Sequence, residues 1–274
     1  MADREYETVT VERIGLIERI TLNRPEKRNA LDTTLQREIV EAVHEAERGG
    51  EVRVIVLRGA GPSFCAGYDI NPTKEEREYV APRTVEEHVT LTASYGQLWG
   101  QIWNCRIPVI AQVHGYCIAG GSDLALHCDL VVMADDAQIG FPPVRSMGSP
   151  PTHMWLYHAG VQHSKRLLLT GDTISGEEAA RIGLALESVP ADALEARVME
   201  LAEHIAEIPH DLLVYNKRIV NLGVDMMGRN QMQMVAAMND TLAHLAPEVQ
   251  AYSQALREKG VAGAARERDA KFAQ

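Results

Sequence analysis

The sequence predicts an α/β fold, with parallel strands packed between helices, followed by a helical C-terminal region. Three short, mostly apolar runs at 52–57, 108–113 and 130–134 have the composition of strands buried on both faces. Helical or glycine-rich segments separate these runs, which is the order of an α/β core. From residue 191 onward the pattern becomes helical almost throughout. The length of 274 residues fits one large domain, or one with a smaller one, so we place a soft boundary near 190.

The elements of the core follow in order along the chain. Residues 7–23 alternate between apolar and polar side chains, which predicts two strands around a turn at Gly15. Apolar side chains at helical spacing predict a helix over 31–47, and a second helix fits 85–103. Residues 71–84 are polar and contain proline, so they are expected to form a surface segment.

The region from 191 to 274 is expected to be built from helices. Its first helix has an amphipathic face whose members recur at steps of four and three, namely Leu194, Val198, Leu201, Ile205 and Ile208. Further helices are predicted over 211–222, 229–245 and 248–259. Five methionines lie here, and core packing or a subunit seam explains them better than a cofactor site: Met226, Met227, Met232, Met234 and Met238.

Composition excludes several classes of function. Lys plus Arg is 27 and Asp plus Glu is 38, so the net charge of −11 argues against a nucleic-acid partner. No apolar run has the length of a membrane span, and the first residues contain no apolar signal segment. We therefore expect a cytoplasmic protein with no membrane partner. The four cysteines contain no C-x-x-C pair, so no metal site is expected and the thiols should be reduced: Cys65, Cys105, Cys117 and Cys128.

Two glycine-containing loops follow buried strands and are the places where chemistry is expected. In 114–129, glycines lead into a short helix, whose first N–H groups lack intrahelical partners and suit an anion. A tight turn that only packs closely would explain this segment equally well. The loop 64–70 follows another buried strand and also offers N–H groups. Both loops should lie at the carboxyl edge of the sheet, where two N–H groups could hold one carbonyl oxygen as it becomes negative.

Four segments carry a resemblance to a known family through their order, spacing and content together: NRPEKRNAL at 23–31, PSFCAGYDI at 62–70, IPVIAQVHGYCIAGGSDLALHCDLVVMADDAQIG at 107–140 and LLLTGDTISGEEAARIGL at 167–184. By these segments the chain resembles the crotonase (enoyl-CoA hydratase/isomerase) family over most of its length. The resemblance implies a ββα spiral core, and a helical C-terminal region that forms a homotrimer or a dimer of trimers. It also implies an acyl-CoA thioester as substrate, of which coenzyme A is a part, so no separate cofactor is expected.

By the same resemblance, the oxyanion hole falls on the N–H groups of Tyr68 and Gly120. Gly120 is the middle of the family's glycine triplet, which here reads Ala119-Gly120-Gly121. In the family these donors hold the thioester oxygen and stabilise an enolate. The ring of Tyr68 is an additional candidate for shaping the acyl pocket.

The resemblance also assigns residues to the binding of coenzyme A. Ala66, Asp69 and Ile70 match the loop that borders the adenine and pantetheine. Lys27 and Arg28 occupy positions where family members often place cations near the phosphates. A solvated turn is the alternative explanation for these two cations.

The sequence departs from the family where its hydratases carry two glutamates. The first position holds Asp123 and the second holds Pro143, which cannot transfer a proton. Asp123 is the remaining acid/base candidate, although an Asp near a helix N-terminus is also favoured by capping and by the helix dipole. Hydration of crotonyl-CoA by the usual two-carboxylate mechanism is therefore expected to be poor.

The stretch 141–158 replaces the family's usual catalytic segment. Arg145 is a candidate for binding a carboxylate on the acyl group, and His153 for acting as a base, whereas a structural role is the alternative for each and for His158. His127 is expected in the core.

Three functions remain open. The nearest is an enoyl-CoA hydratase-like lyase, and the next is a hydrolase or isomerase of the same fold that uses groups in 141–158. The third is an acyl-CoA-binding protein without efficient catalysis. Tyr252, Arg257 and Lys259 are candidates for meeting the coenzyme A of a neighbouring subunit.

Overall fold

The computed structural model describes residues 5–70 and 84–272. It has a six-stranded sheet with the order β1-β2-β3-β4-β6-β9. The strands are β1 (Val9–Ile14), β2 (Ile17–Leu22), β3 (Val54–Gly59), β4 (Val109–Val113), β6 (Leu130–Ala134) and β9 (Glu187–Val189). Only β1 runs antiparallel to its neighbour, and the other pairings are parallel. The predicted α/β core is therefore confirmed, and the surface segment expected at 71–84 lies, except for Thr84, outside the described residues.

A second, three-stranded sheet has the order β5-β7-β8 and holds the glycine-rich segment. Its strands are β5 (Tyr116–Ile118), β7 (Gln138–Gly140) and β8 (Thr173–Ser175). The strand at 116–118 has no counterpart among the elements that the sequence predicts, because three residues are too few to show alternation. The pairing of β5 with β7 ties the segment before Gly120 to the segment before Pro143.

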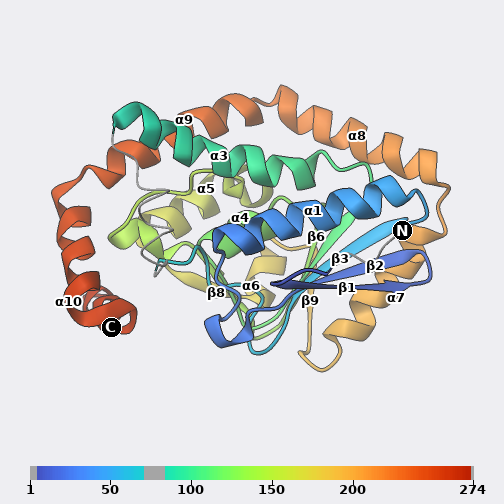
Figure 1. The fold of residues 1–274 in the computed structure, drawn as a ribbon, viewed down its shortest axis with the longest axis horizontal. Coiled ribbons are helices and arrows are strands. Elements are labelled where there is room, and N and C mark those ends of the chain that lie inside the picture. Colours follow the sequence, from blue (N-terminus) through green and yellow to red (C-terminus); the bar gives the residue numbers. More distant parts are fainter. Residues whose placement is uncertain (1–4, 71–83, 273–274) are drawn as a thin grey trace.

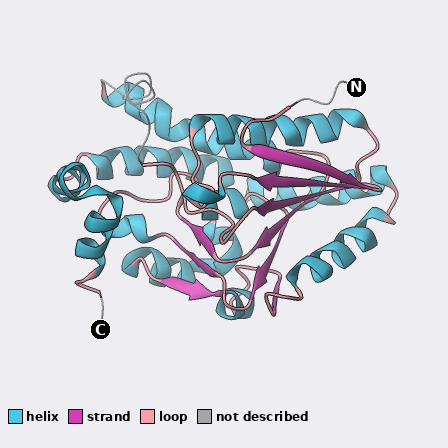
Figure 2. Ribbon diagram, turned by 60° about the horizontal axis from the view of Figure 1, so that its bottom comes forward, coloured by secondary structure: helices cyan, strands magenta, loops and turns pink. Residues whose placement is uncertain are grey.

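Helices cover both faces of the larger sheet (Figures 1 and 2). The helices up to residue 206 are α1 (Thr33–Gly49), α3 (Val85–Trp103), α4 (Gly120–Ala125), α5 (Trp155–Thr170), α6 (Gly176–Arg181) and α7 (Leu194–Ala206), with short 3-10 turns η1 (Pro25–Lys27) and η2 (Pro142–Arg145). Of these, α1, α6 and α7 pack directly on the larger sheet. Side-chain caps set where α1 and α3 begin. Asp32 accepts the Leu35 N–H at α1, and Thr84 forms a capping box with Glu87 at α3.

Three further helices complete the C-terminal region, namely α8 (His210–Met226), α9 (Arg229–His244) and α10 (Pro247–Asp269). α7 packs against β3, β4 and β6 and belongs to the core layers, whereas α8 and α9 run back along the top of the molecule (Figure 1). α9 lies along α3, where the Thr92 hydroxyl bonds the Ala237 carbonyl and the Thr241 hydroxyl. α10 bends at Gly260, whose φ of 67° interrupts the helix, so the chain extends past the predicted end at 259.

Four of the five C-terminal methionines contradict the expectation of core packing, whereas Met232 is half-buried. Met226 is 89% exposed and Met227 is 72% exposed, and Met234 and Met238 are also exposed. Met226 ends α8, Met227 directly follows it, and Met234 and Met238 lie on α9, so the apolar side chains here are exposed within the part of the chain that the structure describes. The alternative of a subunit seam remains a prediction.

The four cysteines are buried and free. Among the described residues, none of the helices combines the length and the apolar character that a membrane crossing needs.

Candidate active site

The two glycine-containing loops meet at the carboxyl edge of the larger sheet. Backbone hydrogen bonds join them directly, because the Cys65 N–H donates to the Tyr116 carbonyl at 2.9 Å and the Ile118 N–H donates to the Cys65 carbonyl at 3.0 Å. Asn29, from a third segment of the chain, also holds the first loop, because its buried side-chain amide donates to the Ser63 carbonyl at 2.8 Å. The placement predicted from the strand order is therefore observed.

Two glycines allow this close approach. A methyl group on Gly121 would lie 2.5 Å from the Cys65 carbonyl oxygen, so any larger residue would separate α4 from the 64–70 loop. Gly67 has a φ of 106°, and a methyl group there would lie 3.0 Å from the Ala119 Cβ and 3.5 Å from the Gly120 nitrogen. The backbones at 67 and 120 are therefore neighbours in space.

The N–H groups of Tyr68 and Gly120 are without acceptors among the described residues. Tyr68 pairs with Leu31 in a parallel bridge, whose hydrogen bonds run through the Gly67 carbonyl and the Asp69 N–H. In such a bridge the amide of Tyr68 itself faces away from Leu31. Gly120 is the first residue of α4, so its N–H has no intrahelical partner. Both amides are free to meet a ligand.

Ala119 sets the direction of the second amide. Its φ of 53° and ψ of −119° are unusual for a residue with a Cβ, and ψ at 119 determines how the Gly120 N–H is turned. Surrounding bonds hold the strained residue in place. Its N–H donates to the Gly140 carbonyl at 3.0 Å, and its carbonyl accepts the Ser122 hydroxyl at 2.6 Å.

A pocket of about 410 Å³ opens beside these loops. Its walls come from the 66–70 loop, β5, the 141–151 segment, α3, α9 and α10. Among the lining residues are Tyr68, Asp69, Ile70, Tyr95, Ala119, Pro143, Asp240, His244, Tyr252 and Arg268. This size suits a small-molecule group with a few fixed polar contacts. A larger cavity of about 700 Å³ lies between α1, α3 and α9, away from both glycine loops.

Asp123 lies directly behind the pocket wall. Its side chain is buried, one oxygen accepts the Thr152 hydroxyl at 2.7 Å, and the other accepts the Tyr68 hydroxyl at 3.3 Å. Burial raises the pKa of Asp123 to about 7, and the negative charge of Asp240 adds to the rise, whereas the bonds from Thr152 and Tyr68 oppose it. A carboxyl with this pKa can both accept and release a proton near neutral pH.

The side chain of Tyr68 connects Asp123 to the pocket. Its ring packs on that of Tyr95, with centroids 4.4 Å apart, and its hydroxyl accepts the Trp99 N–H at 3.0 Å. Burial raises the pKa of Tyr68 well above its usual value, and the charge of Asp123 contributes, so the phenol stays protonated. Sequence analysis missed Trp99, Tyr95 and Thr152, because residues spread over α3 and a loop show no local motif.

The residues expected to bind coenzyme A lie along one edge of the 66–70 loop. Lys27 and Arg28 are exposed at η1, and the Ala66 N–H donates to the Arg28 carbonyl at 3.0 Å. Arg24, which sequence analysis did not single out, joins Asp69 at 3.2 Å. Asp69 and Ile70 line the pocket, as does Ala66.

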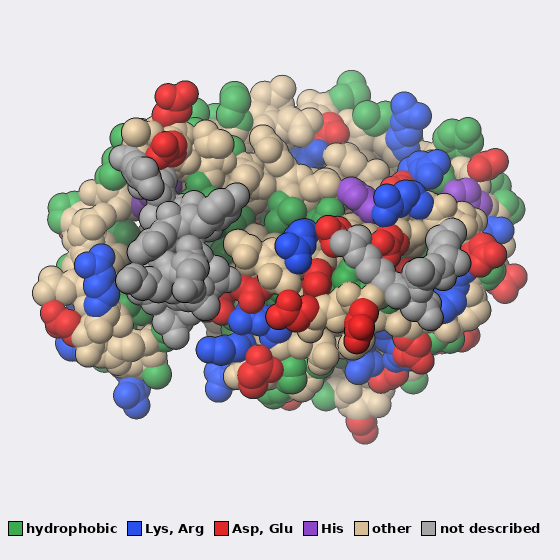
Figure 3. Space-filling view, viewed as in Figure 1, with side chains coloured by type: hydrophobic (Ala, Val, Ile, Leu, Met, Phe, Trp, Pro, Cys, Tyr) green, Lys and Arg blue, Asp and Glu red, His purple; other side chains and the backbone are tan. Residues whose placement is uncertain are grey.

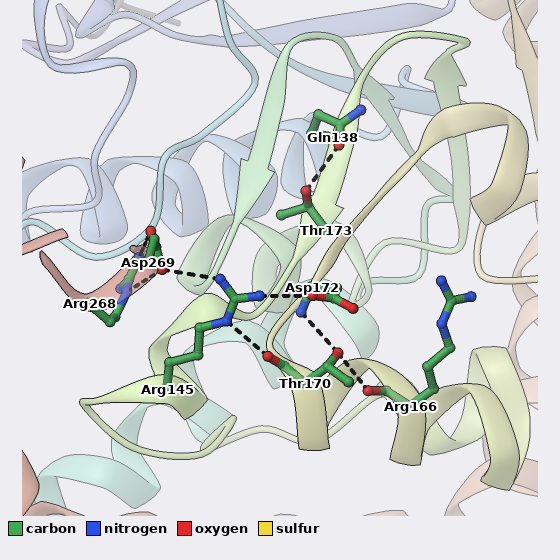
Figure 4. Close-up of polar contacts among 8 residues, drawn as sticks. All are labelled: Gln138, Arg145, Arg166, Thr170, Asp172, Thr173, Arg268 and Asp269. Atoms are coloured by element: carbon green, nitrogen blue, oxygen red, sulfur yellow. Dashed lines mark hydrogen bonds and ion pairs between the residues drawn. The ribbon is translucent and has the colours of Figure 1, made fainter. Parts of the chain in front are cut away.

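Arg145 has its guanidinium engaged within the chain (Figure 4). It donates to the Thr170 carbonyl at 2.8 Å, to Asp172 at 2.8 Å and to Asp269 at 3.1 Å, and it packs on the Phe272 ring. These contacts tie the end of α10 to the segment after β7, and they favour the structural explanation of Arg145.

The histidines and the other C-terminal candidates are placed as follows. His127 is buried in the core as expected, bonded to the Asp123 carbonyl at 2.7 Å. His158 contacts the Leu126 carbonyl, and neither His153 nor His158 lines the pocket. Tyr252 lines this chain's own pocket, whereas Lys259 pairs with Glu267 and Arg257 is exposed.

Asp240 and His244 of α9 are pocket residues to which sequence analysis gave no role. They stand four residues apart, on the same helix face as the buried Ala236 and Ala237. The spacing alone does not show that this face of α9 is buried against the pocket, so the sequence carried no sufficient signal for the pair.

Comparison with known proteins agrees with the motifs. The family model described as enoyl-CoA hydratase/isomerase matches residues 12–272. A putative enoyl-CoA hydratase of Mycobacterium tuberculosis is 35% identical over 250 residues, which cover 82% of this chain and 77% of the relative. A hydroxycinnamoyl-CoA hydratase-lyase of Pseudomonas fluorescens is 35% identical over 206 residues, or 74% of each chain.

Solved structures show the same similarity in three dimensions. An enoyl-CoA hydratase from Mycobacterium smegmatis superposes with a TM-score of 0.91 at 35% identity, covering 97% of this chain and 94% of the other. An enoyl-CoA hydratase/isomerase from Xanthobacter autotrophicus superposes with a TM-score of 0.91 at 30% identity, covering 98% and 100%. The chain therefore belongs to the enoyl-CoA hydratase/isomerase family, the crotonase family that its motifs predicted.

Proposed function

We propose that this chain is an acyl-CoA-processing enzyme of the hydratase-like type that stabilises a thioester enolate between the N–H groups of Tyr68 and Gly120. One observation carries the proposal: two neighbouring amides without acceptors among the described residues, beside a pocket wall formed by Tyr68 and Ala119. As negative charge develops on the thioester oxygen, donors fixed in a site that excludes water contribute about 3–4 kcal/mol each.

Asp123 supplies proton transfer behind this pair of amides. Its carboxylate is bonded to the Tyr68 hydroxyl, whose ring faces the pocket, so a proton can pass between Asp123 and the acyl group through the phenol or through a bound water. Pro143 lines the pocket at the position of the family's second glutamate and carries no titratable group. Hydration of crotonyl-CoA by the two-carboxylate route is therefore expected to be slow.

Coenzyme A binds along the 24–29 and 66–70 loops as a part of the substrate. The exposed charges of Lys27 and Arg28 are suited to its phosphates. The acyl group enters the pocket, where Tyr68, Tyr95 and Tyr252 offer aromatic walls.

The working assembly is proposed to be a homotrimer or a dimer of trimers. α8 and α9 expose an apolar face in this chain, whose members include Tyr215, Ile219, Val220, Met226, Met234, Met238 and Leu242. Apolar side chains are visible along the upper rim of the molecule in Figure 3, where these helices run. Many exposed large apolar side chains on two neighbouring helices support a protein–protein contact there.

The test measures binding and turnover of a panel of CoA esters that includes crotonyl-CoA and an aromatic enoyl-CoA. In Gly120→Ala the new methyl group would lie 2.7 Å from the Tyr68 ring, which should abolish turnover. Gly49→Ala, at the end of α1, is the matched control, because the space around Gly49 is open. Tight binding of esters without any product would instead support an acyl-CoA-binding protein. The hydrolase or isomerase alternative has less support, because Arg145 is engaged elsewhere and His153 does not line the pocket.

A further inference from the structure

α9 brings a second buried carboxylate into the pocket. Asp240 is 4% exposed and lines the same cavity as Tyr68 and Pro143. Its Oδ1 atom accepts the Ser149 N–H at 2.8 Å. The hydrogen bond from the Thr92 hydroxyl of α3 to the Ala237 carbonyl holds α9 in place, and with it the position of Asp240 at the pocket.

The segment that carries Pro143 is shaped around this carboxylate. The Pro143 carbonyl accepts the N–H groups of Met147 at 2.7 Å and Gly148 at 3.1 Å, so the chain turns back after Pro143. A methyl group on Gly148 would lie 2.3 Å from the Asp240 Oδ1. The segment that lost the family's glutamate therefore leaves room, at Gly148, for a carboxylate from another element.

The surroundings of Asp240 leave its charge uncompensated. Within the part of the chain that the structure describes, no Lys or Arg forms an ion pair with it, and Arg268 of the same pocket pairs with Asp269. Burial raises the pKa of Asp240 to about 7, although the Ser149 N–H opposes the rise. The other titratable groups facing it are Asp123 and Tyr95, besides His244.

Two histidines follow Asp240 in a row, His244 on α9 and then His88 on α3. The His244 Nε2 lies 3.6 Å from the Asp240 Oδ1, and its Nδ1 lies 2.7 Å from the Nε2 of His88 on α3. Burial lowers the pKa of His244 to about 4, and the neighbouring His88 adds to the effect. His244 is therefore neutral near pH 7, and a neutral imidazole can take a proton on one nitrogen and give one from the other.

We propose that Asp240 is a catalytic acid/base that replaces the glutamate lost at Pro143, with His244 and His88 as its proton path. The inference rests on the proposed function, because it uses the same pocket and the same thioester. Asp123 and Asp240 then form the carboxyl pair of this enzyme, one from α4 and one from α9.

In the hydration direction, water adds across the Cα–Cβ double bond of the enoyl thioester. The Asp240 carboxylate takes a proton from water while the water oxygen bonds to Cβ of the enoyl thioester. The Cα–Cβ π bond breaks, and its electron pair moves through Cα to the thioester oxygen, held by the Tyr68 and Gly120 amides. When the enolate collapses, Cα takes a proton from the Asp123 carboxyl, through the Tyr68 hydroxyl or a water. The proton on Asp240 passes to the His244 Nε2 when a side-chain shift closes the 3.6 Å gap to hydrogen-bond distance, the Nδ1 proton of His244 passes to His88, and His88 releases one proton to solvent. Asp123 regains one proton from solvent.

The test compares Asp240→Asn with wild type on the CoA ester of the panel that wild type converts fastest. Asn keeps the shape and can still accept the Ser149 N–H, so the fold should survive. Turnover should fall about 10²–10⁴-fold, the range for loss of a general acid or base. Binding of a saturated acyl-CoA should stay within the error of wild type. Asp192→Asn, at an exposed position before α7, is the matched control and should keep wild-type turnover.

A second pair of variants tests position and path. Gly148→Ala should lower turnover by displacing the Asp240 carboxylate, without changing any titratable group. His244→Ala should lower turnover less than Asp240→Asn does, and added imidazole should restore it. Restoration by imidazole is not expected of a histidine that serves only in packing.

The outcomes separate this inference from the function on which it rests. If wild type neither binds nor converts any ester, the proposed function and the inference both fall. If Gly120→Ala is inactive but Asp240→Asn keeps wild-type turnover, the proposed function stands and Asp240 is not catalytic. A rise in KM for some esters with kcat unchanged would make Asp240 a specificity residue and would overturn the proposal as well.

Discussion

Glu38 and Asp123 are both buried carboxylates, but the chain surrounds them in opposite ways. Burial alone would raise the pKa of Glu38, yet the Thr8 hydroxyl and the N–H groups of Glu7 and Thr8 outweigh it and hold the pKa below its usual value. Asp123 receives two hydroxyl donors and no backbone donor among the described residues, and its pKa is raised to about 7. This difference shows that the fold can give a buried carboxylate enough hydrogen-bond donors to keep its pKa low. At the pocket it does not do so.

The same contrast extends to Asp240, which has one backbone donor and a raised pKa. Groups that only hold structure gain from being fixed in one protonation state, whereas a group that transfers protons must be able to change state near the working pH. We therefore expect opposite effects of substitution in the two regions. Replacing a pocket carboxylate should lower activity but not stability, whereas replacing Glu38 should lower stability but not activity.

The largest expected effect is on activity at the pocket. Asp123→Asn should lower turnover about 10²–10⁴-fold, because the amide cannot transfer a proton but keeps the size of the side chain. Steady-state rates on the best CoA ester measure this, with the exposed Asp192→Asn as control. A variant with the wild-type rate would reduce Asp123 to a structural acceptor for the Thr152 and Tyr68 hydroxyls and would contradict the comparison.

The next effect concerns stability as a function of pH. The folded pKa of Asp123, about 7, lies above the unfolded value of 3.8, so the folded state binds the proton more tightly. The stability from this group is fully present below pH 3.8 and is lost as pH rises through about 7. The effect amounts to several kcal/mol, since each unit of pKa corresponds to about 1.4 kcal/mol.

Asp123→Asn should therefore raise the free energy of unfolding at pH 8 relative to wild type, although it lowers activity. Denaturant unfolding at pH 5 and pH 8 measures the difference, which should be larger at pH 8. Equal differences at the two pH values would contradict the raised pKa.

Glu38 should behave in the reverse sense. Glu38→Gln removes a charged acceptor of three donors and should destabilise the protein by about 2 kcal/mol at pH 7. Because the folded pKa is lowered, this contribution is present above the unfolded value of 4.5 and is lost as pH falls through the folded pKa. Urea unfolding at pH 7 and pH 4 measures it, with the exposed Glu203→Gln as control. Turnover per folded molecule should not change.

Sequence predicted the local parts of this molecule well. The helix over 85–103 and the strand over 130–134 are observed at their predicted bounds, because apolar periodicity and capping residues act over a few positions. The meeting of the 64–70 loop with Gly120 also followed from strand order alone. The pairing of α9 with α3 could not be predicted in this way, since nothing local specifies which helix lies against another. Asp240 and His244 were missed for that reason.

Backbone strain was also invisible in the sequence. The family's glycine triplet begins with Ala119 here, and composition gave no sign that this alanine would adopt a φ of 53°. Only the structure shows this conformation at the residue that directly precedes Gly120. The strained backbone at Ala119 lies in the same region as Asp123 and Asp240. The free-energy cost of the strain and that of burying these carboxylates are therefore both found at the pocket.

The smallest expected effect comes from relieving that strain. Ala119→Gly should raise the free energy of unfolding by about 1 kcal/mol, because glycine adopts this conformation without a Cβ clash. Ala251→Gly, at an exposed position in α10, should instead lower it by about 1 kcal/mol, the usual difference in a helix. Thermal unfolding of both variants measures the contrast. If Ala119→Gly is destabilised as much as Ala251→Gly, the bonds from Gly140 and Ser122 leave no strain to relieve, and the pocket differs from the core only in its carboxylates.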